Sequence, residues 1–346
     1  MRLAFRFCAP APSLTQALSK LQPLRSSRLL ATLLVLSLAA FVHAQNYTSI
    51  VVFGDSLSDT GNVTHLTLTK YGIPIPSPVA NYTYGRFTDG FDTAPAAHNY
   101  QGVWVEQLAA MLPAHPVVKD SLDGGTNYAY GFATTGSGTS VLTLGSGLNA
   151  PFVNVNNVGT QISTYLATHP KITSKTLFVV WAGAIDVLYA SKPQDVVDAA
   201  IDQASNIQRL IAAGATQFII PNLPPLGAVP RFNGLPSQAL TATQGAVLYN
   251  ATLAAGVDIV RFFSFGRVQI HMLDVFSLFN HVIASPATYS LNNVTSMSQG
   301  VLTANPDLYL FWDDLHPTTR GHNILALAAD KLINPHASQL QDFAQR

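Results

Sequence analysis

Apolar runs of strand length alternate along this chain with segments of helical spacing. The strand-like runs are Ser49–Gly54, Thr176–Trp181, Thr216–Ile220 and Arg267–Leu273. The segments with helical spacing are Gly102–Leu112, Asn157–Thr168, Gln194–Ala213, Ser237–Phe263 and Thr319–Leu332. Because parallel strands need long crossover connections that are usually helical, this alternation predicts a mostly parallel sheet with helices on both faces. We therefore expect an α/β fold with any site beyond the carboxyl ends of the strands.

One predicted helix, 194–213, has clear end signals and a predicted buried face. Pro193 precedes it and Gly214 follows it, as helix start and stop signals do. The apolar positions that share one face are Val197, Ala200, Ile201, Ala204, Ile207, Leu210 and Ile211. Two stretches rich in Gly, Pro and Asn, 74–100 and 136–156, exceed ordinary connections. They either wall a substrate cleft or form elaborate surface loops.

The first 44 residues are interpreted as a signal peptide. Basic residues and no acidic ones precede an apolar run from Leu29 to Val42, and "VHA" ends at Ala44 in the pattern of a cleavage site. That run is shorter than the roughly 20 residues that span a bilayer. An uncleaved N-terminal anchor is the alternative. We expect a secreted protein whose residues 45–346 form a single domain.

Loss of the first 44 residues would change the charge balance. The whole chain has 18 basic and 18 acidic residues, and the segment removes Arg2, Arg6, Lys20, Arg25 and Arg28, which leaves 13 against 18 and a net charge of −5. A mildly acidic protein without a basic patch is not expected to bind nucleic acid or to associate stably with an anionic membrane. The only cysteine, Cys8, lies in the same segment, so no disulfide is expected. We expect a monomer.

A serine follows the first predicted strand directly. The run "IVVFGDSLSDTGNV" (50–63) ends its apolar part at Gly54 and then presents Ser56. A serine hydroxyl becomes an effective nucleophile when an imidazole takes its proton and an acid holds that imidazole in the right tautomer. Near the other end of the chain, Asp313 and His316 stand three positions apart in a loop before the last predicted helix. This spacing fits a catalytic pair, and it also fits a pair that only caps a loop.

Several motifs together resemble one known family. Gly54-Asp55-Ser56-Leu57 followed by Asp313-x-x-His316-Pro317 is similar to the GDSL branch of the SGNH hydrolases, which is named for four blocks carrying Ser, Gly, Asn and His. "GTNYAYGFATTG" (125–136) resembles the second block and "WAGAIDVL" (181–188) the third. "YGRFTDG" (84–90), "VWVEQLA" (103–109) and "NLPPLGAVP" (222–230) resemble stretches of plant and fungal GDSL esterases. The resemblance covers nearly all of the chain after residue 44, in the right order.

The resemblance implies the SGNH hydrolase fold, a flavodoxin-like three-layer α/β/α sandwich, and the hydrolysis of carboxylic esters. It implies that Ser56 is the nucleophile, that His316 is the general base and then acid, and that Asp313 orients His316. It also implies an oxyanion hole that includes the backbone N–H groups of Ser56 and Gly131. No metal-ligand cluster or cofactor motif is found in the sequence, and ester hydrolysis by a triad needs no cofactor.

The third block departs from the family pattern. Ile185 stands where the family has an asparagine whose side-chain amide completes the oxyanion hole. Loss of one such donor typically costs on the order of 10²- to 10³-fold in rate. Asn127 is a conceivable substitute donor, and Asp186 is expected to be structural. A weakly active or non-catalytic family member that binds glycans is therefore an alternative to an enzyme.

The resemblance also suggests a substrate class. A secreted chain of this length is similar to the fungal acetylesterases of carbohydrate esterase family 16, which implies a small ester or an acetylated plant-wall oligosaccharide as substrate. A lipase or phospholipase would share the same triad and prefer long acyl chains. Trp104, Trp181 and Trp312 either stack on sugar rings or pack in the core.

Five Asn-x-Ser/Thr sequons occur in the chain, at Asn46, Asn62, Asn81, Asn250 and Asn293. Behind a predicted signal peptide they indicate a secreted glycoprotein. Asn62 is the sequon least expected to carry a glycan, because it lies close after Ser56 and a glycan there would crowd the entrance to the site.

Overall fold

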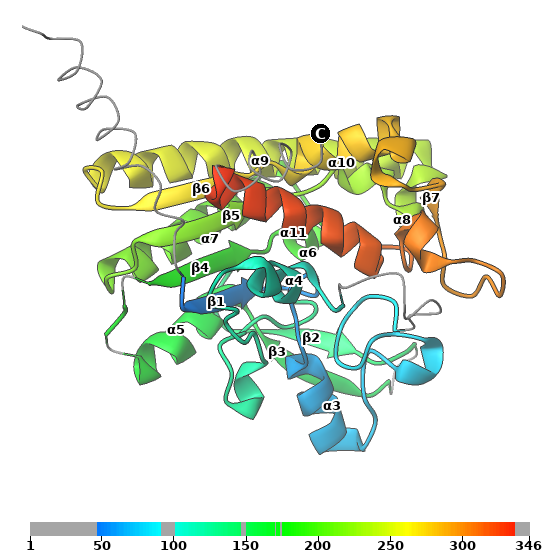
Figure 1. The fold of residues 1–346 in the computed structure, drawn as a ribbon, viewed down its shortest axis with the longest axis horizontal. Helices are drawn as coiled ribbons and strands as arrows, with labels where there is room; N and C mark the ends of the chain where they lie inside the picture. Colours follow the sequence, from blue (N-terminus) through cyan, green and yellow to red (C-terminus); the bar gives the residue numbers. More distant parts are fainter. Residues whose placement is uncertain (1–46, 91–100, 147–149, 170, 174, 336–346) are drawn as a thin grey trace, which may run out of the picture. The chain divides into compact units, whose positions relative to one another are not determined.

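The computed structural model describes residues 47–90, 101–146, 150–169, 171–173 and 175–335. The predicted signal peptide 1–44 and the sequon at Asn46 lie outside these residues. The central sheet is wholly parallel and is built in the order β1 (Ser49–Gly54), β4 (Thr176–Trp181), β5 (Gln217–Pro221) and β6 (Gln269–Leu273) (Figure 1). Each of these strands agrees with its predicted range to within two residues at either end.

The extended segment 126–128 continues this sheet beyond β1. The backbone N–H of Val52 donates to Thr126 O at 3.1 Å, and the N–H of Tyr128 donates to Val52 O at 2.8 Å. The bridge between Val52 and Asn127 is parallel. With this segment counted as the second strand along the chain, the spatial order is the 2-1-3-4-5 order of flavodoxin-like folds. The predicted α/β fold with a parallel central sheet is confirmed.

Helices cover both faces of the sheet (Figure 1). One apolar core joins the sheet to α4 (Trp104–Met111), α10 (Val275–Ala284) and α11 (Thr319–Ile333), and a second core joins it to α5 (Val158–Thr168), α7 (Pro193–Ala212) and α9 (Pro236–Phe263). Successive strand residues point to opposite faces, so Val52 belongs to the first core and Val51 to the second. Because both faces are buried, the strands appear in the sequence as continuous apolar runs rather than alternating ones.

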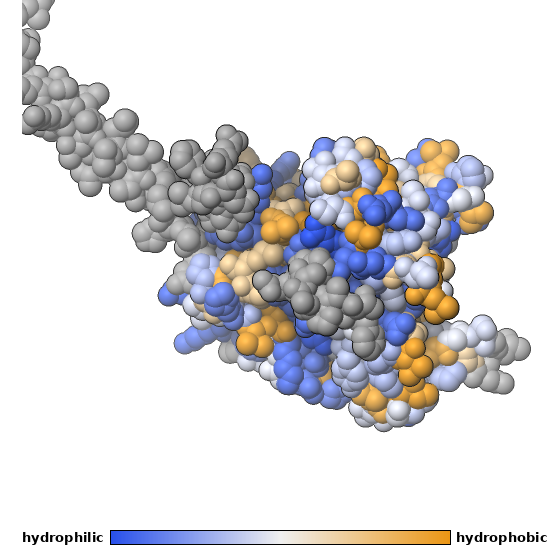
Figure 2. All heavy atoms as spheres, turned by 45° about the vertical axis from the view of Figure 1, so that its right-hand side comes forward, coloured by the Kyte–Doolittle hydropathy of each residue, from blue (hydrophilic) through white to orange (hydrophobic). Residues whose placement is uncertain are grey.

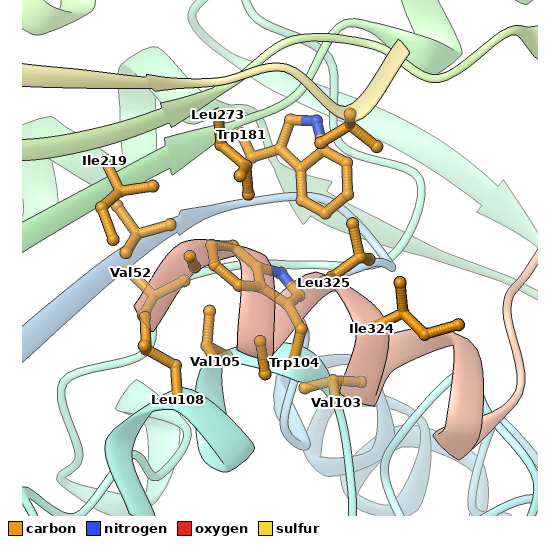
Figure 3. Close-up of a cluster of buried hydrophobic side chains, with 14 of the residues drawn as sticks. Val52, Val103, Trp104, Val105, Leu108, Trp181, Ile219, Leu273, Ile324 and Leu325 are labelled. Atoms are coloured by element: carbon orange, nitrogen blue, oxygen red, sulfur yellow. The ribbon is translucent and has the colours of Figure 1, made fainter. Parts of the chain in front are cut away.

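The tryptophans lie inside the protein. In the first core, the rings of Trp104 and Trp181 meet edge to face with their centroids 5.6 Å apart, surrounded by aliphatic side chains (Figure 3). Trp312 is only 4% exposed. Such burial favours the packing role for all three residues over a role as open platforms for sugar rings.

The remaining elements are short. The sequence did not predict α3 (Asn62–Tyr71), α6 (Ala184–Tyr189), α8 (Pro230–Asn233), the antiparallel pair β2 (Thr139–Thr143) and β3 (Phe152–Asn156), or the parallel pair β7 (Asn293–Met297) and β8 (Tyr309–Phe311). Single turns of 3₁₀ helix lie at Pro78–Ala80, Ser121–Asp123, Leu226–Ala228, Pro286–Tyr289 and Pro306–Leu308. The stretch 136–156, which we expected to be loop, therefore contains a β-hairpin.

The helix α7 shows one difference from the sequence pattern. Its buried residues are Val196, Ala199, Ala200, Gln203, Ala204, Asn206, Ile207 and Leu210. Ile201, which the periodicity placed on the buried face, is 51% exposed. Relative to the face expected from the sequence, the buried face is rotated so that it includes two polar side chains. Gln203 donates to Val180 O at 3.1 Å and Asn206 donates to Thr135 O at 2.8 Å. These hydrogen bonds fix the rotation of the helix.

Among the described helices, α9 is long and apolar enough to cross a membrane by length and composition. It lies along α7, and its side chains Ala246, Tyr249 and Leu253 are fully buried in the second core. This packing accounts for one face of the helix, while Leu240, Val247, Ile259, Phe262 and Phe263 on α9 are exposed. On the face shown in Figure 2, hydrophobic residues form small separate groups among hydrophilic ones.

Candidate active site

Strand β1 carries Ser56 to the carboxyl edge of the sheet. The end of the strand is held by Gln161, whose side chain accepts from the N–H of Gly54 and donates to its carbonyl, each at 2.9 Å. A Cβ at Gly54 would lie 2.3 Å from Trp181 O, so only glycine allows this approach of β1 to β4. The chain therefore leaves the strand at a defined point, two residues before Ser56.

Two buried acidic side chains brace the turn around Ser56. Asp55 Oδ1 accepts from the N–H of Leu57 at 3.0 Å, and Asp59 Oδ1 accepts from the N–H of Asn62 at 2.8 Å. The backbone N–H of Ser56 itself has no acceptor within the part of the chain that the structure describes. It is free to donate to a ligand, as the predicted oxyanion hole requires.

The structure brings Ser56, His316 and Asp313 into one hydrogen-bonded series. Ser56 Oγ lies 2.8 Å from His316 Nε2, although the two residues are 260 positions apart in the chain. His316 Nδ1 lies 2.7 Å from Asp313 Oδ2. Asp313 Oδ1 accepts from the backbone N–H groups of Leu315 at 2.8 Å and His316 at 2.6 Å. The geometry is that of a nucleophile, its base and the acid that orients the base.

The electrostatics of this series follow from burial and pairing. Burial disfavours a charge on His316, but the negative charge of Asp313 and the hydrogen bond to it outweigh this effect and raise the pKa of His316. Burial also opposes the ionisation of Asp313, yet His316 and the hydrogen bonds that the carboxylate accepts hold its pKa well below the usual range. Asp313 is therefore ionised at neutral pH. Next to the nucleophile, burial raises the pKa of Asp55 to about 7.

The loop that carries the acid and the base is anchored to its neighbours. Inside the loop, the N–H of Trp312 donates to His316 O at 2.8 Å. Outside it, Arg231 Nε pairs with Asp314 Oδ2 at 2.9 Å, and Thr88 Oγ1 donates to Pro317 O at 3.0 Å. These contacts hold His316 over Ser56.

Two aromatic residues at this site were not identified from the sequence. The hydroxyl of Tyr82 donates to Asp313 Oδ2 at 2.8 Å, and the ring of Phe87 lies 5.2 Å from the ring of His316. Both belong to the stretch 74–100, which the sequence identified as a possible cleft wall; its residues 91–100 lie outside the described residues. In the sequence, Phe87 lies within the motif "YGRFTDG" and Tyr82 lies two residues before it. This position did not indicate which side chains would reach the triad.

The predicted role of Gly131 in the oxyanion hole is not supported. The N–H of Gly131 donates to Asp59 Oδ2 at 2.9 Å, because the buried carboxylate needs donors on both oxygens. A Cβ at Gly131 would lie 2.5 Å from the Phe87 ring, so the glycine is required for packing. The next residue, Phe132, has a left-handed φ of 71°, which is uncommon away from glycine. Its N–H finds no acceptor among the described residues.

The third block contributes an apolar wall instead of an amide. Asn127, the conceivable substitute donor, is fully buried; its Nδ2 donates to Ser58 O at 2.6 Å and its Oδ1 accepts from Ala129 at 2.9 Å. The suggestion that Asn127 replaces the missing donor is therefore wrong. Asp186 accepts from the N–H and the hydroxyl of Thr135, both at 3.1 Å, which agrees with its expected structural role.

A small apolar cavity adjoins the nucleophile. Its volume is about 50 Å³. It is lined by Asp55, Ser56, Leu57, Trp181, Ala184, Ile185, Leu188, Pro224, Leu226, Val229, Phe279, Phe311, Leu315, His316 and Pro317. Ile185 is thus one of many apolar side chains that face the space beside Ser56 and His316. The cavity can take a small apolar group that is attached to a carbonyl carbon at Ser56.

The described sequons differ in accessibility. Asn62 is completely buried, and its amide nitrogen donates to the carbonyls of Asn127 and Ala129, each at 2.8 Å. The folded chain therefore leaves no room for a sugar on Asn62, the sequon that the sequence made the least expected to carry a glycan. Asn81 is exposed, while Asn250 and Asn293 are half-buried.

One group of side chains within the described ranges has metal-ligand proximity. The ligand atoms of His65, Asp120 and Asp123 lie within 4.8 Å of one another. Lys119 Nζ, however, lies 3.3 Å from Asp123 Oδ2 and already balances its charge. We therefore assign no metal site to these three residues.

The fold and the site together define a class. A flavodoxin-like sheet that presents a serine, a histidine and an aspartate in series at its carboxyl edge is a scaffold for a serine nucleophile. The chain belongs to the GDSL-like lipase/acylhydrolase family, whose model matches residues 50–329.

Relatives of several kinds share this family likeness. Lipase 1 of Photorhabdus luminescens is 29% identical over 205 residues, which cover 58% of this chain and 26% of the relative. The thermolabile hemolysin of Vibrio parahaemolyticus is 24% identical over 83% of this chain and 64% of its own length. GDSL esterase/lipase 6 of Arabidopsis thaliana is 25% identical over 85% of this chain and 88% of its own. The chain thus spans less than two thirds of these two bacterial relatives.

Among solved structures, a carbohydrate acetylesterase of Sinorhizobium meliloti aligns with a TM-score of 0.42 and 14% identity, over 82% of this chain and 96% of its own.

Proposed function

We propose that this protein hydrolyses carboxylic esters with Ser56 as the nucleophile. The observation that carries the proposal is the series Ser56 Oγ–His316 Nε2 at 2.8 Å and His316 Nδ1–Asp313 Oδ2 at 2.7 Å. In the first step, Ser56 Oγ attacks the acyl carbon and its proton passes to His316 Nε2. His316 then returns this proton to the leaving alcohol, and an acyl-Ser56 ester remains. A water molecule, deprotonated by His316, then attacks the acyl carbon, and the bond to Ser56 Oγ breaks as His316 passes the proton to Oγ, which releases the acid and restores Ser56.

Charge on the tetrahedral intermediates needs fixed donors. The N–H of Ser56 is one such donor, since no described residue accepts from it. With Ile185 at the usual amide position and Gly131 bonded to Asp59, we propose the N–H of Phe132 as the second donor. A hole of two backbone donors would make a slower enzyme than one of three.

The size of the apolar cavity supports a short acyl group. A cavity of about 150 Å³ can hold benzene, which corresponds to roughly 25 Å³ for each carbon. The cavity beside Ser56 measures about 50 Å³, which suits the two carbons of an acetyl group. A lipase or phospholipase that buries a long acyl chain at this place would need several times that volume. This observation favours an acetylesterase over a lipase.

Our proposals for the alcohol part of the substrate and for the location of the protein are based on the sequence. We propose acetylated plant-wall carbohydrate as substrate, in line with the similarity to fungal acetylesterases of carbohydrate esterase family 16. We also propose secretion and glycosylation, because the sequence has the pattern of a signal peptide and exposes the sequon at Asn81. A secreted protein whose first residue is Gln45 would support cleavage after Ala44.

One alternative follows from a specific observation. Ile185 offers no donor to an oxyanion, so a glycan-binding protein with negligible turnover is the second candidate. The deciding experiment is the hydrolysis of p-nitrophenyl acetate by the purified protein, with Ser56→Ala prepared in the same way. We expect hydrolysis that disappears in the variant. Equal rates in both proteins, or none in either, would favour the binding protein.

A further inference from the structure

The phenol of Tyr82 reaches the acid of the triad from a distant loop. Its hydroxyl donates to Asp313 Oδ2 at 2.8 Å across 231 positions of sequence. The ring packs edge to face on Trp312, with centroids 5.8 Å apart and an interplanar angle of 88°. This packing fixes the direction of the hydroxyl, so the contact is part of a built arrangement and not a chance meeting of surface groups.

Tyr82 shares one oxygen of Asp313 with the base. Oδ1 of Asp313 is occupied by the two backbone N–H groups of Leu315 and His316. Oδ2 accepts from His316 Nδ1 at 2.7 Å and also from the Tyr82 hydroxyl. A donor on Oδ2 draws negative charge away from the hydrogen bond to His316. The attraction that favours protonated His316 is then weaker than an unshared Oδ2 would make it.

Resting on the ester hydrolysis proposed above, we propose that Tyr82 is a positioning residue that sets the basicity of His316 through Asp313. Its hydroxyl orients the carboxylate and limits how strongly that carboxylate holds a proton on the imidazole. His316 is consequently neutral, and able to accept the proton of Ser56, at a lower pH than a bare aspartate–histidine pair would allow.

The other groups around His316 do not replace this effect. The charged or titratable groups whose fields act on His316 or respond to it are Asp313, Asp55, Asp314 and His322. Asp314 forms an ion pair with Arg231 at 2.9 Å. Burial raises the pKa of Asp55 to about 7, but Asp55 is the same in the wild-type protein and in a Tyr82 variant, so it does not account for a difference between them. Burial lowers the pKa of His322 to about 3, so His322 is uncharged. Burial and the nearby Asp313 raise the pKa of Tyr82, so its hydroxyl stays a donor throughout the working pH range.

Tyr82→Phe tests the proposal, because it keeps the ring on Trp312 and removes only the hydroxyl. The matched control is Tyr84→Phe, since Tyr84 is 55% exposed and its hydroxyl has no hydrogen bond to a described residue. For each protein, kcat/KM for p-nitrophenyl acetate is measured against pH. We expect the acid limb of the profile to move up by about half a pH unit in Tyr82→Phe and to stay in place in Tyr84→Phe.

A second measurement separates this proposal from the esterase itself. The imidazole of His316 is titrated by NMR, with its signal assigned by comparison with His316→Gln. A rise in its pKa in Tyr82→Phe supports the role of Tyr82 even if the wild-type protein hydrolyses no ester. A variant that is folded and less active, but has an unchanged acid limb and an unchanged His316 titration, would show that Tyr82 only packs and would overturn the proposal.

Discussion

Replacement of Ile185 by alanine should lengthen the acyl group that the protein accepts. Ile185 lies on α6 and lines the cavity of about 50 Å³ beside Ser56. Ile185→Ala removes three carbons, which at roughly 25 Å³ each adds about 75 Å³ of space. The enlarged cavity would take a butanoyl group, which the native cavity cannot enclose.

The magnitude follows from the methylenes that become buried. Butanoate has two more methylene groups than acetate, and burial of each is worth about 0.8 kcal/mol, or about 1.6 kcal/mol together. Since 1.4 kcal/mol corresponds to a factor of ten, the ratio of kcat/KM for butanoate to that for acetate should rise about 15-fold. The gain concerns the ratio, so a general loss of activity in the variant does not hide it.

The assay compares p-nitrophenyl acetate, butanoate and octanoate for the wild-type protein, Ile185→Ala and the control Ile201→Ala. Ile201 is 51% exposed on α7 and does not line the cavity, so its variant should keep the wild-type ratio. Two results would refute the reasoning. One is a wild-type preference for octanoate over acetate, and the other is an unchanged ratio in a folded Ile185→Ala protein.

Three further outcomes are expected. Ile185→Asn restores a side-chain donor and should raise kcat on acetate esters by roughly tenfold or more if the donor limits the rate; no gain would show that another group serves or that the amide cannot reach. His316 must be neutral to act as base, and its pKa is raised from 6.5, so kcat/KM should fall as the pH drops through a value above 6.5; an acid limb below 6.5 would contradict this. Glycopeptide mapping of secreted protein should find Asn62 unmodified, because its side chain is buried and hydrogen-bonded, and Asn81 accessible; occupancy of Asn62 in active protein would contradict the buried arrangement.

The architecture could be predicted because it depends on local patterns. Strands buried on both faces have continuous apolar sequences, and helices that cover them have helical spacing and recognisable ends. The four strands of the sheet follow the predicted ranges closely. The position of Ser56 at the sheet edge followed from the same pattern, since the strand before it ends at Gly54.

Contacts between distant segments could not be predicted from local sequence patterns. The apolar spacing of α7 predicted the helix but not its rotation, because Gln203 and Asn206 form hydrogen bonds to partners elsewhere in the fold. In the same way, Gly131 matched a motif, yet a buried carboxylate 72 positions earlier takes its N–H. No local sequence pattern predicts which donor will form a hydrogen bond to a buried acceptor.

For the site, the sequence by itself determined the kinds of groups available: a serine after a strand, an aspartate and a histidine three apart, and an isoleucine in place of an amide. The tertiary structure alone decided how they meet, through the 2.8 Å approach of His316 to Ser56 and the contact of Tyr82 with Asp313. It also decided that Ile185 faces a cavity sized for a short group. The physical reason is that residue types and local spacing are properties of short segments. Hydrogen bonds between distant side chains and cavity volumes, in contrast, arise only when separate segments of the chain pack together.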